Sequence, residues 1–465
     1  MATNDTTLPL RRAGDVDIIE ASIYTSTNSV SGEGLTNPVY VDVKLFISEL
    51  NLFEDMFGPG LYGNILMIDA ANLIGAMKLT GDEWLSLKIK TPTMDDDAAL
   101  INKMFRIYSI TERQMVSDAG KQSYIMHFCS PEILKDALSP IYKTFKGPVQ
   151  KVVQEIFENY IATTRTAKGG DVTPVLIIPP TQNEVKFTSP GWRPIQCLNW
   201  LASRTLAANY KNPGYLFFET NKSFRFANVE ALIDIAIQNK TVYQEYRFTP
   251  KKLSSNPDNP NVDYTQDINV EYGKVEDMQV IENYNFLKNL QNGYYANKLF
   301  TLDVVTKQYD IHTYSHVDSY GQYKHLENIG GLTDCAPFTQ LVDNDPNGYL
   351  MFYPKHSGLY SDFGAANVSD TITQTLAPRT STLNELNNFK VEITVPGRTD
   401  IEVGAVIYYY VPDSSPRDET NKFEERLDPM LSGYYLVTAI RHKFTLASHV
   451  MILEIVRDSL NKGNS

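Results

Sequence analysis

Hydrophobic and polar residues alternate with a period of two along the first third of the chain, which is the pattern of strands that bury one face. The alternation begins at Val39–Ile47. The further strands predicted in this part are Leu61–Asp69, Trp84–Lys90, Phe105–Val116 and Gln122–Cys129. The turn sequence Ser117–Gly120 joins the last two strands as a hairpin. We predict a small antiparallel barrel or sandwich over residues 36–130, and a flexible arm rich in Thr, Ser, Asn and Gly over residues 1–35.

The pattern then changes to helical spacing. Apolar residues in Pro148–Ile161 fall on one face of a helix, and Pro194 is suited to the first turn of a second helix. Leu216–Glu219 and Ser223–Phe226 flank a short polar turn and read as a hairpin. We predict a mixed α+β domain over residues 131–235.

Strand patterns return in the last part of the chain. The strands predicted there are Asp267–Tyr272, Val391–Val395, Val403–Val411, Tyr434–Lys443 and His449–Arg457. Pro250–Asp263 holds several Pro, Ser and Asn residues and is predicted to be an exposed loop. We assign residues 236–290 and 386–460 to one β-unit, residues 291–385 to a β-rich inserted domain, and residues 461–465 to a C-terminal tail.

Two predicted hairpins, at 105–129 and 434–457, resemble each other in length and in closing their units. Self-similarity of this kind is typical of tandem copies of one supersecondary unit. The predicted fold class is therefore mainly β with α+β, with two related antiparallel β-barrel domains, a mixed α+β domain and a β-rich insertion.

Composition narrows the classes of function. The 465 residues carry a formal net charge of −13, which argues against tight binding of nucleic acid through its phosphates. A negative conduit would still let DNA slide past, because like charges repel. The 28 Tyr and 21 Phe residues favour a β-rich protein with partners.

Cysteine usage and the N-terminus point to a reducing compartment. Cys129, Cys197 and Cys335 are widely separated and form no CxxC pair, so neither a disulfide framework nor a zinc site is expected. The polar segment Met1–Asp15 lacks the apolar core of a secretion signal. No stretch reaches the ~18 apolar residues of a membrane-spanning helix. We expect a protein that stays in the cytoplasm until it is assembled.

Two loop motifs imitate ligand sites. Gly58–Gly63 fits the GxGxxG string of dinucleotide sites, but Asn64–Asp69 after it is predicted to be a strand, where the motif requires a helix. Asp343–Gly348 imitates the start of a calcium loop, yet Pro354 stands where the closing Glu belongs. Both are interpreted as ordinary turns.

The search for chemistry gives no catalytic, cofactor-binding or metal residue. His312 and His316 have a metal-ligand spacing only in a helix, whereas Tyr309–His316 alternates as a strand. Asp95–Asp97 is interpreted as solvated loop surface. No GxSxG motif, P-loop or catalytic Cys setting is present in the sequence. A pair of glycosidase carboxylates leaves no local signature.

The order of several segments resembles the baseplate hub protein of T-even-type contractile-tailed phages, over most of the chain. The segments that carry the resemblance are Leu61–Asp69, Gly81–Glu83, Phe105–Tyr108, Ser130–Glu132, the helix 148–161, the predicted helix Trp192–Ala207, Gly433–Val437 and Ile440–His442. The longer N-terminal arm and the longer loop before Gly433 depart from the family.

The resemblance implies a non-enzymatic structural subunit. In that family two tube-like β-barrels per chain form a homotrimeric ring with pseudo-sixfold symmetry. One face of the ring accepts the tail tube, the other carries the trimeric cell-puncturing spike, and DNA passes through the channel without specific binding. The expected location is the tail baseplate of the virion, among neighbouring baseplate proteins, after assembly in the host cytoplasm.

Two alternatives stay open. The hub of a phage-derived bacterial injection system would share the barrels. A cell-wall hydrolase is suggested by aromatic residues and carboxylates, and would be a monomer that clears cell-wall substrate. A nucleic-acid-binding module is disfavoured by the net charge.

Overall fold

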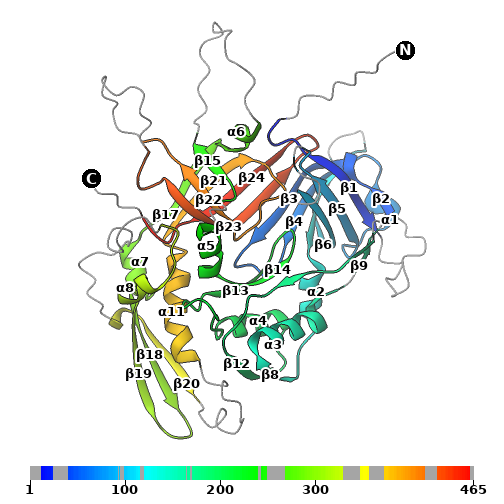
Figure 1. The fold of residues 1–465 in the computed structure, drawn as a ribbon. Coiled ribbons are helices and arrows are strands. Elements are labelled where there is room, and N and C mark those ends of the chain that lie inside the picture. Colours follow the sequence, from blue (N-terminus) through cyan, green and yellow to red (C-terminus); the bar gives the residue numbers. More distant parts are fainter. Residues whose placement is uncertain are drawn as a thin grey trace, which may run out of the picture.

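The alternating segments form one large sheet in the computed structural model, with helices and smaller sheets on one side of it (Figure 1). The structure describes residues 12–24, 40–92, 94, 99–115, 120–163, 165–167, 170–238, 242–248, 268–327, 346–355, 371–413 and 427–460. The predicted class, mainly β with α+β elements, is confirmed. None of the helices in these ranges is both long and apolar enough to cross a membrane.

The first half of the large sheet contains seven strands. They are β1 (Asp17–Tyr24), β2 (Tyr40–Asp42), β3 (Ile47–Asp55), β4 (Tyr62–Asp69), β5 (Trp84–Lys90), β6 (Leu100–Met115) and β7 (Gln122–Cys129). They lie in the order β3-β4-β7-β6-β5-β1-β2, and every neighbouring pair is antiparallel. A short 3-10 helix, η1 (Lys44–Phe46), and a helical turn, α1 (Leu73–Met77), connect strands of this half. The inward side chains form a hydrophobic core of their own.

The second half repeats this arrangement. Its strands are β15 (Glu245–Phe248), β16 (Lys274–Val275), β17 (Asp277–Asn283), β21 (Phe389–Pro396), β22 (Val406–Tyr410), β23 (Gly433–Phe444) and β24 (His449–Val456). Their order in the sheet is β17-β21-β24-β23-β22-β15-β16. When the seven strands of each half are numbered in chain order, both halves have the same spatial order, 3-4-7-6-5-1-2. The difference is β15, which is parallel to both of its neighbours where β1 is antiparallel. A second hydrophobic core is centred on this half and extends to residues of the mixed α+β part.

The two halves also agree residue by residue. β4 and β21 both bury alternate residues, and so do β7 and β24. In both halves the buried residues of one strand stand opposite buried residues of its neighbour. The β6–β7 and β23–β24 hairpins each carry a bulge directly after the residue that faces Phe128 or Ile455. On this register Phe128 corresponds to Ile455, and Gly63, its partner on β4, corresponds to Val391 on β21.

Each half is strongly curled. β2 and β3 stand at opposite ends of the strand order, although only residues 43–46 separate them in the chain. β16 and β17 also stand at opposite ends of their half, and only Glu276 separates them. Such short connections require each half to bend until its ends approach. Among the described residues no strand pairing between β2 and β3 completes a barrel, so a closed tube-like form stays a prediction.

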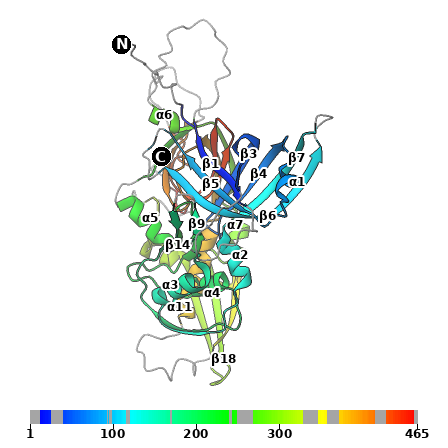
Figure 2. The same cartoon turned by 90° about the vertical axis from the view of Figure 1, so that its right-hand side faces the viewer.

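The mixed α+β part lies between the halves in sequence and on one side of the large sheet (Figure 2). Its elements are α2 (Pro131–Leu138), β8 (Thr144–Pro148), α3 (Val149–Ile156), a π-helical turn η2 (Phe157–Ile161), β9 (Arg165–Ala167), β10 (Gly170–Val172), β11 (Leu176–Ile177), β12 (Glu184–Thr188), α4 (Pro194–Ala202), β13 (Tyr215–Glu219), β14 (Phe224–Asn228) and α5 (Val229–Gln238). The predicted helix over 148–161, the helix opened by Pro194 and the β13–β14 hairpin are confirmed. The second helix ends at Ala202, short of the predicted Ala207.

The insertion between β17 and β21 projects from the large sheet (Figure 1). Its elements are α7 (Phe286–Gln291), β18 (Ala296–Asp303), β19 (Tyr309–Ser315), α8 (His316–Ser319), η3 (Tyr320–Gln322), η4 (Pro346–Gly348), β20 (Leu350–Lys355) and α11 (Ile372–Glu385). The three strands form a separate sheet in the order β19-β18-β20. The long helix α11 was not predicted. Its small and polar residues, with Pro378 inside, give a weak helical pattern, and packing against β18 and β19 compensates.

Two strand assignments were wrong at the edges of the halves. Within the predicted flexible arm, Asp17–Tyr24 forms β1, because its backbone pairs with the otherwise open edge of β5 and buries Ala21 and Ile23. The predicted strand Val39–Ile47 breaks into β2, η1 and the start of β3, because the chain must turn from one end of the half to the other.

A third assignment was wrong near the Pro-rich loop. The segment predicted as the strand Asp267–Tyr272 is instead a helical turn, α6 (Ile268–Tyr272). Five residues are too few for alternation to distinguish strand from helix, and the turn buries Tyr272. The predicted loop Pro250–Asp263 lies outside the described residues.

Candidate functional site

The two halves meet along one strand junction. β23 is long enough to have two neighbours on one edge: Gly433–Leu436 pairs with β22, and Ala439–Phe444 pairs with Leu50–Asp55 of β3. Ion pairs support the outer side of this ladder, where the Glu49 carboxylate lies 2.9 Å from Lys443 Nζ. Hydrogen bonds from Asn51 and Lys443 lower the pKa of Glu49. The junction therefore fixes the position of one half relative to the other.

A buried chain of polar side chains lies behind the junction. His442 Nε2 is 3.3 Å from Glu54 Oε1, and His442 Nδ1 is 3.0 Å from His449 Nε2. Since a carboxylate oxygen accepts, His442 donates to Glu54 through Nε2, and a second hydrogen bond joins the two imidazole rings. Burial, followed by the neighbouring His442, holds the pKa of His449 well below its ordinary value. His449 is therefore neutral, and the two rings link β3, β23 and β24.

β17 and the second part of β6 each have an open edge among the described residues. Among the described residues β17 pairs only with β21. The second part of β6, Tyr108–Met115, pairs only with β7 within the same described ranges, because β5 ends opposite Arg106. Val280 and Ile281 on β17 and Met115 on β6 are exposed. Open edges of this kind are templates for pairing with another chain.

The outer face of the three-stranded sheet is apolar. Phe300 on β18 stacks on Phe352 of β20, with 4.8 Å between ring centroids, and on Tyr309 of β19. Phe352 is 73% exposed. Neighbouring exposed residues on these strands are Leu302, Ile311 and Leu350. The opposite face, represented by Asn297, is buried against α11. A stacked aromatic face in contact with solvent is typical of a protein-binding surface.

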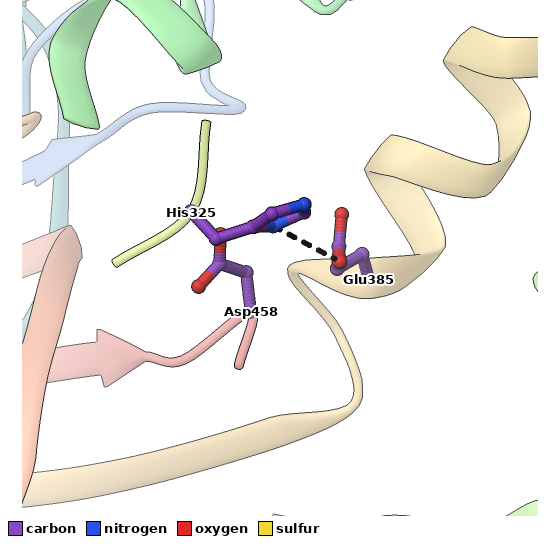
Figure 3. Close-up of side chains that lie close together, drawn as sticks. All are labelled: His325, Glu385 and Asp458. Carbon is purple, nitrogen blue, oxygen red and sulfur yellow. Dashed lines mark hydrogen bonds and ion pairs between the residues drawn. The ribbon is translucent and has the colours of Figure 1, made fainter. Parts of the chain in front are cut away.

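A buried cluster of His325, Glu385 and Asp458 ties the insertion to the end of β24 (Figure 3). His325 Nδ1 lies 3.0 Å from Asp458 Oδ2 and 3.9 Å from Glu385 Oε1. His325 Nε2 lies 2.9 Å from the carbonyl oxygen of Tyr320, whose ring stacks on the imidazole. From the other side His316 Nε2 lies 3.4 Å from Glu385 Oε1.

The spacing of these ligand atoms, all within 4.8 Å of one another, would suit a metal ion. The hydrogen bonds indicate a different state. Both nitrogens of His325 face atoms that only accept, a carbonyl and a carboxylate oxygen, so the ring is an imidazolium without a lone pair for a metal. Burial alone would lower the pKa of His325, but the hydrogen bond and charge of Asp458 and the charge of Glu385 raise it to about 9. The cluster is therefore a buried ionic contact between the insertion and the end of β24, and we call these three residues the latch.

Because of the latch, the free energy of unfolding is expected to fall as the pH rises above neutral. Because the pKa of His325 rises from about 6.5 to about 9 on folding, its contribution of about 3 kcal/mol is complete below pH 6.5 and is lost as the pH rises to about 9. Urea unfolding of the wild type between pH 6.5 and 9 should show this loss. His325→Gln should be less stable at pH 6.5 and should show a flatter profile. Parallel losses in both proteins would contradict the latch.

A second buried ion pair lies beside the latch. Arg457 Nη2 is 3.1 Å from Glu327 Oε1, and Arg457 Nη1 donates to the carbonyl of Met430. Glu327 Oε1 also accepts from the backbone N–H of Tyr434. Gly433 leaves room for the pair, because a Cβ there would overlap both partners. The pair holds the segment after η3 against the first residues of β23.

The glycine-rich and histidine motifs have structural roles. The first residues of the motif, Gly58–Leu61, lie in the turn between β3 and β4, its last two residues begin β4, and the strand predicted after it is confirmed. The predicted strand over Tyr309–His316 is confirmed as far as Ser315, where β19 ends. His312 lies on β19 and His316 begins α8, so the two do not share one helix. His316 contacts Glu385, which was not predicted.

The remaining candidates fall into two groups. Asp95–Asp97, Asp343–Asp345 and Cys335 lie outside the described residues. Cys129 and Cys197 are free and buried, and burial raises the pKa of the Cys129 thiol to about 12. Such a thiol is a weak nucleophile.

The buried clusters were missed because their members come from separate segments. His325, Glu385 and Asp458 each stand alone in the sequence, so no spacing points to them. One signal was present: Arg457 directly follows the apolar alternation of β24, and an arginine at the end of a buried strand requires a partner.

Comparison with solved structures finds phage-tail and secretion proteins at low identity. A tail protein from Neisseria meningitidis MC58 matches with a TM-score of 0.49 and 10% identity, over 94% of this chain and 96% of that chain. The 43 kDa tail protein of prophage MuSo2 from Shewanella oneidensis gives 0.46 and 10%, over 94% and 98%. A chain of the half-lidded Francisella PdpA-VgrG complex gives 0.38 and 10%, over 96% and 58%.

These TM-scores are below 0.5, so the likenesses do not establish a common fold. No protein-family model matches the sequence, and no curated protein matches it.

Proposed function

We propose that this chain is a structural hub subunit of a contractile-tail baseplate. Three copies form a ring that joins the sixfold tail tube on one face to the trimeric cell-puncturing spike on the other. The subunit acts by assembly and carries out no reaction. Its place is the baseplate of the virion, and it is made and assembled in the host cytoplasm.

The observation that carries this proposal is the repeated strand order of the two halves. A single chain with two similar halves gives a trimer six similar units around its axis. Such a ring can meet a sixfold partner with these units and a threefold partner with the features that occur once per chain. Each half would act as one tube-like barrel, since its ends curl toward each other.

The net charge suits a channel for DNA. A ring of three chains, each with a formal charge of −13, repels the phosphate backbone and lets it pass without specific binding. We therefore propose that the inner side of the ring lines the path of DNA during ejection.

The apolar face of the insertion suits a neighbouring baseplate protein. Phe300 and Phe352 lie on a sheet that projects from the large sheet (Figure 1), and the insertion occurs once per chain. A feature repeated three times around the ring fits threefold partners, including the spike.

Mass in solution tests the proposal. Each chain has a mass of 52.5 kDa, and multi-angle light scattering should give three times this value for the chain alone, or a complex that holds three chains once the spike protein is added. The physical reason is the pair of open edges on β6 and β17, which a monomer leaves exposed to water. A monomer under both conditions, above all one that clears cell-wall substrate, would contradict the hub and favour a hydrolase.

A further inference from the structure

The junction inside the chain offers a pattern for the contact between chains. It joins the outer edge of β3, the third strand of its half in chain order, to the second part of β23, the sixth strand of the other half. The equivalent third strand of the second half is β17, and the equivalent sixth strand of the first half is β6. Both of these strands have an open edge among the described residues.

β6 has the same two-part form as β23. Leu100–Arg106 pairs with β5, as Gly433–Leu436 pairs with β22. A bulge follows in both strands, and the remainder then extends beyond the neighbour. In β23 this extension holds β3. In β6 the corresponding extension ends at Met115, which is 72% exposed.

We infer that β17 of one copy pairs antiparallel with the second part of β6 of the next copy, repeating the junction of β3 with β23. This inference rests on the proposed ring and identifies the surface that forms it. Each half offers its third strand to the long sixth strand of the next half, so every contact is head to tail. Contacts of this kind close into a ring when the rotation permits, and junctions within and between chains alternate around it.

The repeated register predicts which residues meet. Asn51 on β3 lies opposite Asn64 of β4, and Gln279 on β17 lies opposite Glu392 of β21. Asn64 and Glu392 each follow directly after the equivalent residues Gly63 and Val391. Gln279 is therefore the counterpart of Asn51.

The residue expected opposite Gln279 lies on β6. By the same comparison of β7 with β24, Gln114 on β6 is the counterpart of Lys443 on β23. Asn51 and Lys443 are partners within the chain. Gln279 of one copy is therefore expected opposite Gln114 of the next. Both glutamines are exposed in the single chain.

Disulfide trapping between different copies tests this register. Residues directly opposite in an antiparallel pair have Cβ atoms ~4.5–5.5 Å apart, close to the reach of a disulfide. Gln279→Cys and Gln114→Cys are made as separate full-length proteins in a Cys335→Ser background, since Cys129 and Cys197 are buried. The two proteins are mixed, oxidised and run on a non-reducing gel, and their masses are measured in parallel.

The expected result is a covalent heterodimer at least ten times more abundant than in the matched control. The control replaces Gln114→Cys by Asn102→Cys, an exposed position on the same strand that is already paired with β5. A trimer without this cross-link, or with equal cross-linking in the control, overturns the inferred junction and leaves the hub intact. A monomer without any cross-link overturns both.

Discussion

Gly63→Val is expected to reduce the free energy of unfolding by about 3 kcal/mol or more, which is typical of severe overpacking. Gly63 lies on β4 opposite Phe128, and a Cβ at this position would overlap the Phe128 ring and the carbonyl oxygen of Asn51. The chain needs glycine here because the large ring occupies the space of a side chain. Denaturant unfolding of the purified variant measures the loss.

The second half provides a matched control for this prediction. At the equivalent positions Val391 faces Ile455, so a smaller partner allows a larger residue. Gly63→Val combined with Phe128→Ile should therefore lose at least about 1 kcal/mol less than the sum of the two single variants. Recovery is partial, because the overlap with the Asn51 carbonyl remains. If the double variant lost as much free energy of unfolding as the two single variants together, the equivalence of the two halves would be contradicted.

Arg457→Met is expected to destabilise the fold by about 3–5 kcal/mol, because it leaves the carboxylate of Glu327 buried without its cation. Arg457 is fully buried and Glu327 nearly so. Burial already raises the pKa of Glu327 despite the neighbouring Arg457. Unfolding by urea at neutral pH measures the effect.

The double variant separates charge from packing. Glu327→Gln added to Arg457→Met removes the unpaired charge and keeps an acceptor for the N–H of Tyr434, so it should recover a large part of the loss. If the double variant were less stable than Arg457→Met alone, the unpaired charge would not be the cause.

Regular alternation made much of the sheet predictable. Trp84–Lys90 and Gln122–Cys129 have the bounds that the pattern predicts, because apolar residues recur at every second position in much of each strand. The α3 helix followed from apolar residues at helical spacing. Both closing hairpins, at 105–129 and 434–457, form as expected.

Elements that depend on distant partners were not predictable. β1 is a short segment beside a polar N-terminal stretch, and it becomes a strand because β5 offers it an edge. α11 is stabilised by packing on the inserted sheet and not by its own pattern. The latch residues His325 and Asp458 are 133 positions apart, so only the fold brings them together. The similar hairpins suggested two related units, whereas their shared strand order is visible only in the pairing.

Imaging of the assembled particle along its axis tests the central claim most directly. Class averages from electron microscopy of the purified protein should show six similar lobes around one channel, in a particle whose mass corresponds to three chains. Three unlike lobes per ring, or lobes in a number other than two per chain, would contradict the account.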